Sequence, residues 1–186
     1  GSMIHAGSIV ERDRGRYYNT SILLGRRGEV LAGYRKIHLF GFQSEEQRRL
    51  APGSRAVTVE TEFGRMGLAT CYDLRFPVWS RNVNNEYDLL IYVASWPQAR
   101  RLAWDTLLCA RALENMCYVC GVNRIGVDGN KLIYNGGSVV FSAKGEVLAS
   151  VPDGEEGIET VSLSLISLQQ LRDKFPVWKD ADAFRL

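Results

Sequence analysis

A cysteine at the end of an apolar run is the first candidate for chemistry in this chain. The segment Gly64–Arg81 reads GRMGLATCYDLRFPVWSR, so Cys71 is followed by Asp73, Arg75 and Pro77. A free cysteine is often a buried small hydrophobe. Where an apolar strand breaks into a polar turn, however, a thiol can be presented as a nucleophile, and the backbone N–H groups after it can face a developing oxyanion. This segment alone leaves both interpretations of Cys71 open.

Lys36 is the second candidate, because it interrupts an otherwise apolar stretch, YRKIHLF at residues 34–40. On an edge strand this lysine would face solvent, whereas inside a pocket it would be desolvated and could favour a neighbouring thiolate. His38 of the same stretch is expected to pack or form hydrogen bonds rather than act as a base. The next segment, residues 42–53, is predicted to be a solvated loop with four charged side chains: Glu45, Glu46, Arg48 and Arg49.

Two further cysteines, Cys117 and Cys120, form a C-x2-C pair. A structural zinc site normally needs two more Cys or His ligands at close spacing, and the sequence has none there. The pair falls where a helix is expected to run into an apolar strand, so we interpret it as two core thiols. A thiol-redox or metal-binding module is a separate hypothesis, which stoichiometric zinc binding would support.

Alternating strands and helices must position these residues. The run LLIYVA is typical of a strand that is buried on both faces. Strands are predicted within residues 6–12, 17–24, 30–40, 56–72, 88–95, 119–126 and 136–150, where 56–72 and 136–150 each hold two strands. Helices are predicted over residues 99–118 and 164–175, with a helical turn over 78–87. This alternation indicates one layered α/β domain over residues 1–186.

Composition excludes several classes of partner. The net charge is only +2, which leaves no electrostatic footprint for nucleic acid or an anionic membrane. The longest apolar stretches are too short to span a bilayer. No signal peptide follows the initial GSM, so we expect a cytoplasmic protein with reduced thiols.

Several motifs in this order resemble the nitrilase (carbon–nitrogen hydrolase) superfamily, most of all its omega-amidase branch. They are YRKIHLF, CYDLRFPVWSR, YVASWPQAR, ARALENMCYV and NRIGVDGNKLIYNGGSVVFSAKGEVLA, and the resemblance extends from about Ala6 to the C-terminal residues. It implies a four-layer α-β-β-α sandwich whose outer faces carry the helices around 103–116 and 165–174. It also implies a homo-oligomer, a dimer or larger, that needs no cofactor and no metal.

The resemblance implies a Glu–Lys–Cys triad for the active site. Within it, Cys71 is the nucleophile and Lys36 is the triad lysine, and the backbone N–H of Tyr72 is a second donor to the oxyanion. Many family members carry a further glutamate near the active site between the lysine and cysteine motifs. Glu46 is the better match for it, and Glu45 is the rival.

The implied substrate is the terminal amide of a small dicarboxylic acid monoamide, such as a 2-oxo acid amide. A nitrile or carbamoyl substrate and the identity of the acyl group stay open. Arg75 is a candidate for binding the free carboxylate of the substrate, since a guanidinium can take it bidentately. An ion pair between Arg75 and Asp73 or another carboxylate is the alternative. Trp96 is a candidate pocket wall, and core packing is its alternative.

The front of the chain departs from the family pattern. The general-base glutamate of the family ends a first strand that precedes all these motifs, whereas Glu11 lies in the strand and turn that follow. The resemblance therefore implies that the N-terminal strand and helices of the domain are missing. A general base contributes roughly 10²–10⁴-fold, so slow or undetectable steady-state hydrolysis is expected. The alternative function is a catalytically impaired domain that acts only in assembly.

Overall fold

The computed structural model describes residues 1–42 and 44–184, and its secondary structure alternates as the sequence predicts. The strands are β1 (Ile4–Asp13), β2 (Arg16–Leu24), β3 (Val30–Arg35), β4 (Val57–Thr61), β5 (Gly64–Thr70), β6 (Leu89–Ala94), β7 (Tyr118–Asn123), β8 (Ile125–Val127), β9 (Ile133–Asn135), β10 (Val139–Phe141) and β11 (Val147–Ser150). The α-helices are α1 (Glu46–Arg49), α2 (Arg101–Asn115) and α3 (Leu165–Lys174). Short 3₁₀ helices span Cys71–Arg75, Val83–Asn85, Gln98–Arg100 and Val177–Asp180.

A six-stranded sheet forms the centre of the molecule, with the strand order β11-β10-β7-β6-β5-β4. Strands β5, β6 and β7 run parallel, and the remaining neighbours are antiparallel. The apolar run LLIYVA forms β6, where Tyr92 is fully buried and Leu90 nearly so. A parallel strand covered on both faces has no side that needs polar residues, and this explains its continuous hydrophobicity.

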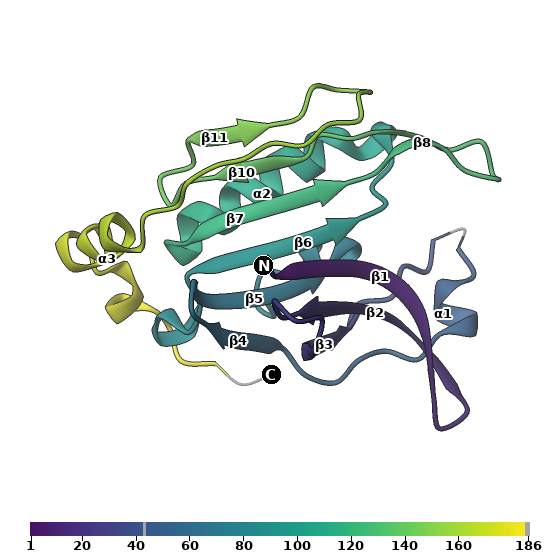
Figure 1. The fold of residues 1–186 in the computed structure, drawn as a ribbon, viewed down its shortest axis with the longest axis horizontal. Coiled ribbons are helices and arrows are strands. Elements are labelled where there is room, and N and C mark those ends of the chain that lie inside the picture. The colour runs from purple at the N-terminus through teal and green to yellow at the C-terminus, as the bar shows by residue number, and fades with distance from the viewer. Residues whose placement is uncertain (43, 185–186) are drawn as a thin grey trace.

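Helix α2 covers one face of this sheet and closes the main core (Figure 1). Trp104, Leu108 and Ala112 recur every four residues, so they share one face of the helix, and all three are completely buried. Gly121 on β7 lies beneath this face, where a Cβ atom would collide with the side chains of Leu108 and Trp104. The glycine therefore allows the helix to approach the sheet closely.

A second, three-stranded sheet of order β1-β2-β3 faces the other side of the central sheet over β4–β6 (Figure 1). Leu23, Tyr34 and Leu68 form the core between the two sheets. The described residues therefore supply three of the four predicted layers: α2 and the two sheets. On this view, no helix among residues 1–42 and 44–184 covers the outer face of β1–β3.

The prediction that α3 lies on an outer face is wrong. The helix sits beyond the ends at which β6 and β7 begin (Figure 1). Arg172 is nearly fully buried there, and its guanidinium binds Asp88 at 2.7 Å and the carbonyl oxygens of Met116 at 2.9 Å and Tyr87 at 2.8 Å. Because these partners lie at the strand starts, the buried arginine fixes α3 to the end of the sheet.

The segment 42–53 also differs from prediction, because part of it is helical rather than an open loop. Helix α1 forms one turn there, and Gln43 lies outside the described residues. The backbone N–H of Gly53 donates to the carbonyl oxygen of Lys36 at 2.8 Å and so ties the two ends of the segment together. This closure turns the helix back toward Lys36.

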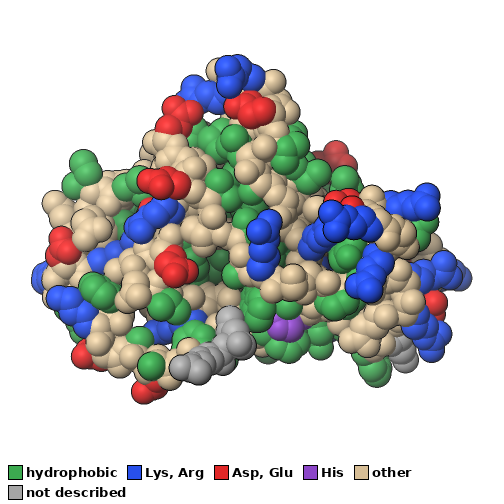
Figure 2. All heavy atoms as spheres, turned by 90° about the horizontal axis from the view of Figure 1, so that it is seen from below, with side chains coloured by type: hydrophobic (Ala, Val, Ile, Leu, Met, Phe, Trp, Pro, Cys, Tyr) green, Lys and Arg blue, Asp and Glu red, His purple; other side chains and the backbone are tan. Residues whose placement is uncertain are grey.

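The surface carries charges of both signs. In Figure 2, basic and acidic side chains are spread over one face together with hydrophobic ones, as a net charge of +2 leads one to expect. Among the helices of the described ranges, none is both long and apolar enough to cross a membrane.

Candidate active site

A cavity of about 680 Å³ lies at the edge of the central sheet where β5 and β6 end. Cys71 directly follows β5, and Ser95 directly follows β6. Lys36 follows β3, while the hairpin of β8 and β9 contributes Asp128 and Tyr134. The carboxyl edge of parallel strands is a common place for ligand sites, because the chain leaves each strand there and its loops converge.

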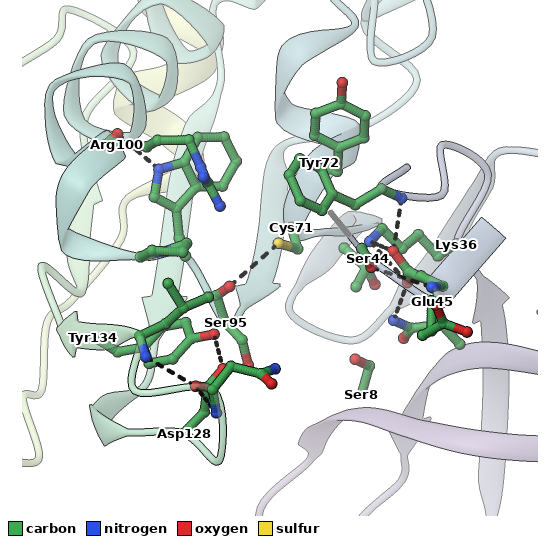
Figure 3. Close-up of a pocket in the computed structure, with 18 of the residues that line it drawn as sticks. Ser8, Lys36, Ser44, Glu45, Cys71, Tyr72, Ser95, Arg100, Asp128 and Tyr134 are labelled. Carbon is green, nitrogen blue, oxygen red and sulfur yellow. Dashed lines mark hydrogen bonds and ion pairs between the residues drawn. The ribbon is translucent and has the colours of Figure 1, made fainter. Parts of the chain in front are cut away.

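Cys71 occupies a sharp turn between strand and helix. Its φ of 49° is left-handed, a conformation that is uncommon for a residue with a Cβ. Its Sγ lies 3.8 Å from the carbonyl oxygen of Ser95, and Figure 3 shows it between that strand end and the group around Lys36. Burial raises the pKa of the thiol, whereas the charge of Lys36 lowers it and that of Glu46 raises it. The effect of burial is larger than that of Lys36, so the pKa of the Cys71 thiol is raised overall. The sequence had instead suggested a thiolate favoured by the lysine.

Lys36 is the desolvated lysine and not a solvent-facing edge residue. Only 3% of it is exposed, and its Nζ donates to both carboxylate oxygens of Glu46, at 2.7 and 2.9 Å. A buried ammonium needs such a partner, since an unpaired charge there would carry a large desolvation cost.

Glu46 is the glutamate that faces Lys36. Besides the lysine, it accepts hydrogen bonds from Asn19 Nδ2 at 2.8 Å and from the backbone N–H of Phe40 at 2.7 Å. Glu45 also lines the cavity, but its carboxylate pairs with Arg48 and Arg49 on the surface. The structure therefore separates two neighbouring glutamates that the sequence left as rivals.

Asp73 fastens the cysteine turn to the lysine segment. Its carboxylate accepts hydrogen bonds from the Tyr34 hydroxyl at 2.6 Å, from the backbone N–H of Thr70 at 3.0 Å and from that of His38 at 3.0 Å. The His38 ring adds a contact through Nδ1 at 2.8 Å and stacks on Phe76. These contacts occupy Asp73, and the suggested ion pair with Arg75 is absent from the described part of the chain.

Three predicted substrate-binding residues line the same cavity. The Tyr72 ring packs edge-on against Phe40. Trp96 is both wall and core: it lines the cavity, yet only 3% of it is exposed. The guanidinium carbon of Arg75 lies 5.1 Å from the centroid of the Trp96 ring. The structure thus brings together all six predicted site residues.

The sequence did not single out several other cavity residues. Asn19 lies within β2, where it is partly buried. A polar side chain in a strand that packs against the core is the sequence feature that could have identified it. Ser8 and Tyr134 also lie within strands, and most of the other missed residues follow strands or belong to turns, where polar residues are common and carry little information. The missed residues include Ser8, Ser44, Ser95, Arg100, Asp128, Asn130 and Tyr134.

The C-x2-C pair lies away from this cavity. Cys117 is fully buried in the main core, and Cys120 lies on β7, where burial raises its pKa to about 11. Over residues 1–42 and 44–184, no group of three or more His, Cys, Asp or Glu side chains is arranged to hold a metal ion. Cys117 is therefore a core thiol, whereas Cys120 is half-buried on the sheet.

Comparison with known proteins links this site to a family. Residues 1–173 match the family model described as carbon–nitrogen hydrolase. The chain is 44% identical over 181 residues to omega-amidase YafV of Escherichia coli K12, covering 97% of this chain and 70% of that protein. It is 38% identical over 188 residues to the 2-oxoglutaramate amidase of Paenarthrobacter nicotinovorans, covering 96% and 63%.

The fold is similar to that of XC1258 from Xanthomonas campestris, a solved structure described as a CN-hydrolase superfamily protein with an arsenic adduct in its active site. The TM-score is 0.91 at 39% identity, over 96% of this chain and 69% of that one. This likeness confirms the predicted fold class, a nitrilase-like α/β sandwich. The matches do not support the prediction that the front part of the domain is missing.

Proposed function

The chain belongs to the carbon–nitrogen hydrolase family, and we propose that it hydrolyses the terminal amide of a small dicarboxylic acid monoamide through an acyl-enzyme on Cys71. The names of its relatives support amide hydrolysis as the reaction. One observation carries the finer proposal: a thiol on a left-handed turn shares a cavity with a buried lysine that is held by a glutamate.

In this mechanism Cys71 Sγ attacks the amide carbonyl carbon. The Lys36 ammonium favours the thiolate and then stabilises the oxyanion of the tetrahedral intermediate, together with the backbone N–H of Tyr72. Collapse of the intermediate breaks the C–N bond and leaves a thioester, and the proton that the thiol lost leaves on the nitrogen as part of the released ammonia. Water hydrolyses the thioester, giving the free acid and restoring the thiol.

Glu46 acts as a positioning residue. Its two oxygens accept hydrogen bonds from three different donor groups, which occupy the lone pairs that a proton acceptor would need. Its part is therefore to hold the Lys36 ammonium beside the thiol. Arg75, whose side chain lines the cavity, would receive the free carboxylate of the substrate.

Trapping the acyl-enzyme tests the reaction. Incubating the protein with 2-oxoglutaramate should release ammonia, and mass spectrometry of the quenched protein should find an acyl group on the peptide that holds Cys71. The Cys71→Ala variant should give neither signal. Cys109→Ala is the matched control, because Cys109 is also half-buried but does not line the cavity. Ammonia release by Cys71→Ala at the wild-type rate would refute the proposal.

We also propose a homo-oligomer that works in the cytoplasm. Helix α2 exposes Leu102 and Leu113, at 81% and 50%, on the side away from the sheet, and such side chains favour packing of a helix against its counterpart in a second copy. The four cysteines are all free thiols, which suits a reducing compartment. Light scattering should give at least twice the chain mass, and a monodisperse monomer at high concentration would contradict the dimer.

A further inference from the structure

The charges that line the active-site cavity do not cancel locally. Lys36 pairs with Glu46. Glu45 pairs with two arginines of α1, outside the cavity. Asp128 accepts hydrogen bonds from its own hairpin: from the backbone N–H groups of residues 130 and 132 and from the Tyr134 hydroxyl at 2.9 Å. These contacts account for the acidic groups of the cavity and for one of its three cations.

The two remaining cations are Arg75 and Arg100. In the described part of the chain, neither guanidinium has a carboxylate within ion-pair distance. The neighbour of Arg100 is different, because Arg101 binds Asp105 and Asp153, each at 2.7 Å. The lack of a partner is therefore not a general property of this region. Arg101 does not line the cavity and has its charge compensated, whereas the side chain of Arg100 lines the cavity without a carboxylate partner among the described residues.

Aromatic rings hold both free guanidinium groups at the cavity. Arg100 Cζ lies 5.1 Å from the centroid of the Phe40 ring, and Arg75 Cζ lies 5.1 Å from that of Trp96. The backbone of Arg100 is fixed as well, since its carbonyl oxygen accepts a hydrogen bond from Trp96 Nε1 at 2.8 Å. Figure 3 shows Arg100 on the side of the cavity opposite Lys36, with Cys71 between them. A guanidinium stacked on a ring keeps its N–H edge free for an anion.

We propose that Arg100 binds the free carboxylate of the substrate together with Arg75, and thereby selects acidic monoamides over neutral amides of the same length. This inference rests on the proposed function and names the residue that sets its substrate class. Two guanidinium groups in a partly buried cavity stabilise a carboxylate by charge-assisted hydrogen bonds. A neutral amide gains none of this stabilisation and leaves both charges without a partner, so it is discriminated against.

The test compares two amides that differ only in the distal carboxylate: glutaramic acid and pentanamide. Arg100→Gln should lower kcat/KM for ammonia release from glutaramic acid by roughly 10- to 100-fold, the effect of losing a hydrogen bond to a charged group. It should leave pentanamide within about twofold. Arg100→Lys keeps the charge but loses the planar fork, so it should fall between the wild type and the glutamine variant.

The control is Arg55→Gln, which removes the same charge from an exposed arginine that does not line the cavity. It should change neither substrate by more than about twofold. Equal losses on both amides with Arg100→Gln would mean a structural role, and no loss on either would mean no contact with the carboxylate. Both results overturn the inference, and neither counts against the proposed amide hydrolysis by the wild-type protein.

A binding experiment keeps the inference testable apart from turnover. Calorimetry with glutarate on the Cys71→Ala protein measures recognition of the carboxylate without any reaction. Arg100→Gln in that background should weaken glutarate binding by roughly 10- to 100-fold. Unchanged affinity overturns the proposal for Arg100. Weakened affinity supports the binding role even if the wild-type protein releases no ammonia, a result that would count only against the proposed function.

Discussion

Replacing Glu46 by glutamine tests whether the buried ion pair is what holds the lysine in the active site. Glutamine keeps the shape of the side chain and removes its charge. Lys36 would then keep an ammonium that is only 3% exposed, without the carboxylate that lies 2.7 Å away in the wild type. The hydrogen bonds from Asn19 and Phe40 to Glu46 would also lose their charged acceptor.

The expected cost follows from this geometry. At 2.7 Å and an effective dielectric constant of about 20, the attraction between the two charges is about 6 kcal/mol. Desolvation offsets part of it, and breaking a buried pair by removing one partner typically costs ~3–5 kcal/mol. We therefore expect Glu46→Gln to lower the free energy of unfolding by ~3–5 kcal/mol. Acyl-enzyme formation should slow by about 10²-fold, because the ammonium leaves its position beside the thiol.

Urea unfolding measures the first effect and ammonia release the second. Glu45→Gln is the matched control: its carboxylate is 56% exposed and pairs with two surface arginines, so it should cost less than about 1 kcal/mol. If the two variants unfold within about 1 kcal/mol of each other, the buried pair does not anchor Lys36 and the reasoning is wrong.

Three further predictions concern the thiol, the turn that holds it and the stability at low pH. Limiting iodoacetamide should alkylate Cys71 before the other three cysteines: burial raises the pKa of its thiol, but Cys71 alone of the four lines this cavity and has Lys36 nearby to favour the thiolate; equal labelling by peptide mapping would count against a nucleophile. Asp73→Ala should lower the free energy of unfolding in urea by at least ~3 kcal/mol, since it leaves three buried donors unpaired at ~1–3 kcal/mol each; a loss below 1 kcal/mol would show that water replaces the carboxylate. Burial lowers the pKa of His5 from 6.5 to about 4, so the folded protein resists protonation there and the stability present above pH 6.5 is lost as the pH falls toward 4. Between pH 6.5 and 4.5 this loss should be about 2 kcal/mol, and a His5→Leu variant with the same pH slope would contradict it.

The sequence alone predicts the elements whose pattern is local. Strand β6 is buried on both faces, which explains its continuous apolar run. Helix α2 is buried on one face, which explains why Trp104, Leu108 and Ala112 recur every four residues. The cysteine motif could be placed at a strand end for the same reason: an apolar run stops there and a polar turn begins. The family resemblance, carried by several motifs in order, added the roles of Cys71 and Lys36.

Contacts between distant parts of the chain decided the rest. Glu45 and Glu46 are neighbours of the same residue type, so the sequence does not distinguish them. The closure of residues 36–53 turns Glu46 toward Lys36 and Glu45 toward solvent. Asp73 lies two positions before Arg75 in the sequence, yet its partners Tyr34 and His38 lie 39 and 35 residues away. No periodicity encodes such pairs, because they depend on how β3 and β5 stack across two sheets.

The position of α3 and the role proposed for Arg100 likewise depend on contacts between distant residues. The helix itself is predicted from the sequence, but the sheet end to which it docks depends on a buried arginine that reaches Asp88, 84 residues away. Arg100 and Arg101 are indistinguishable as neighbouring basic residues. The sequence therefore determines which segments fold and which residues are reactive, whereas only the tertiary structure determines which charges find partners, because side-chain pairing is settled by packing across the whole domain.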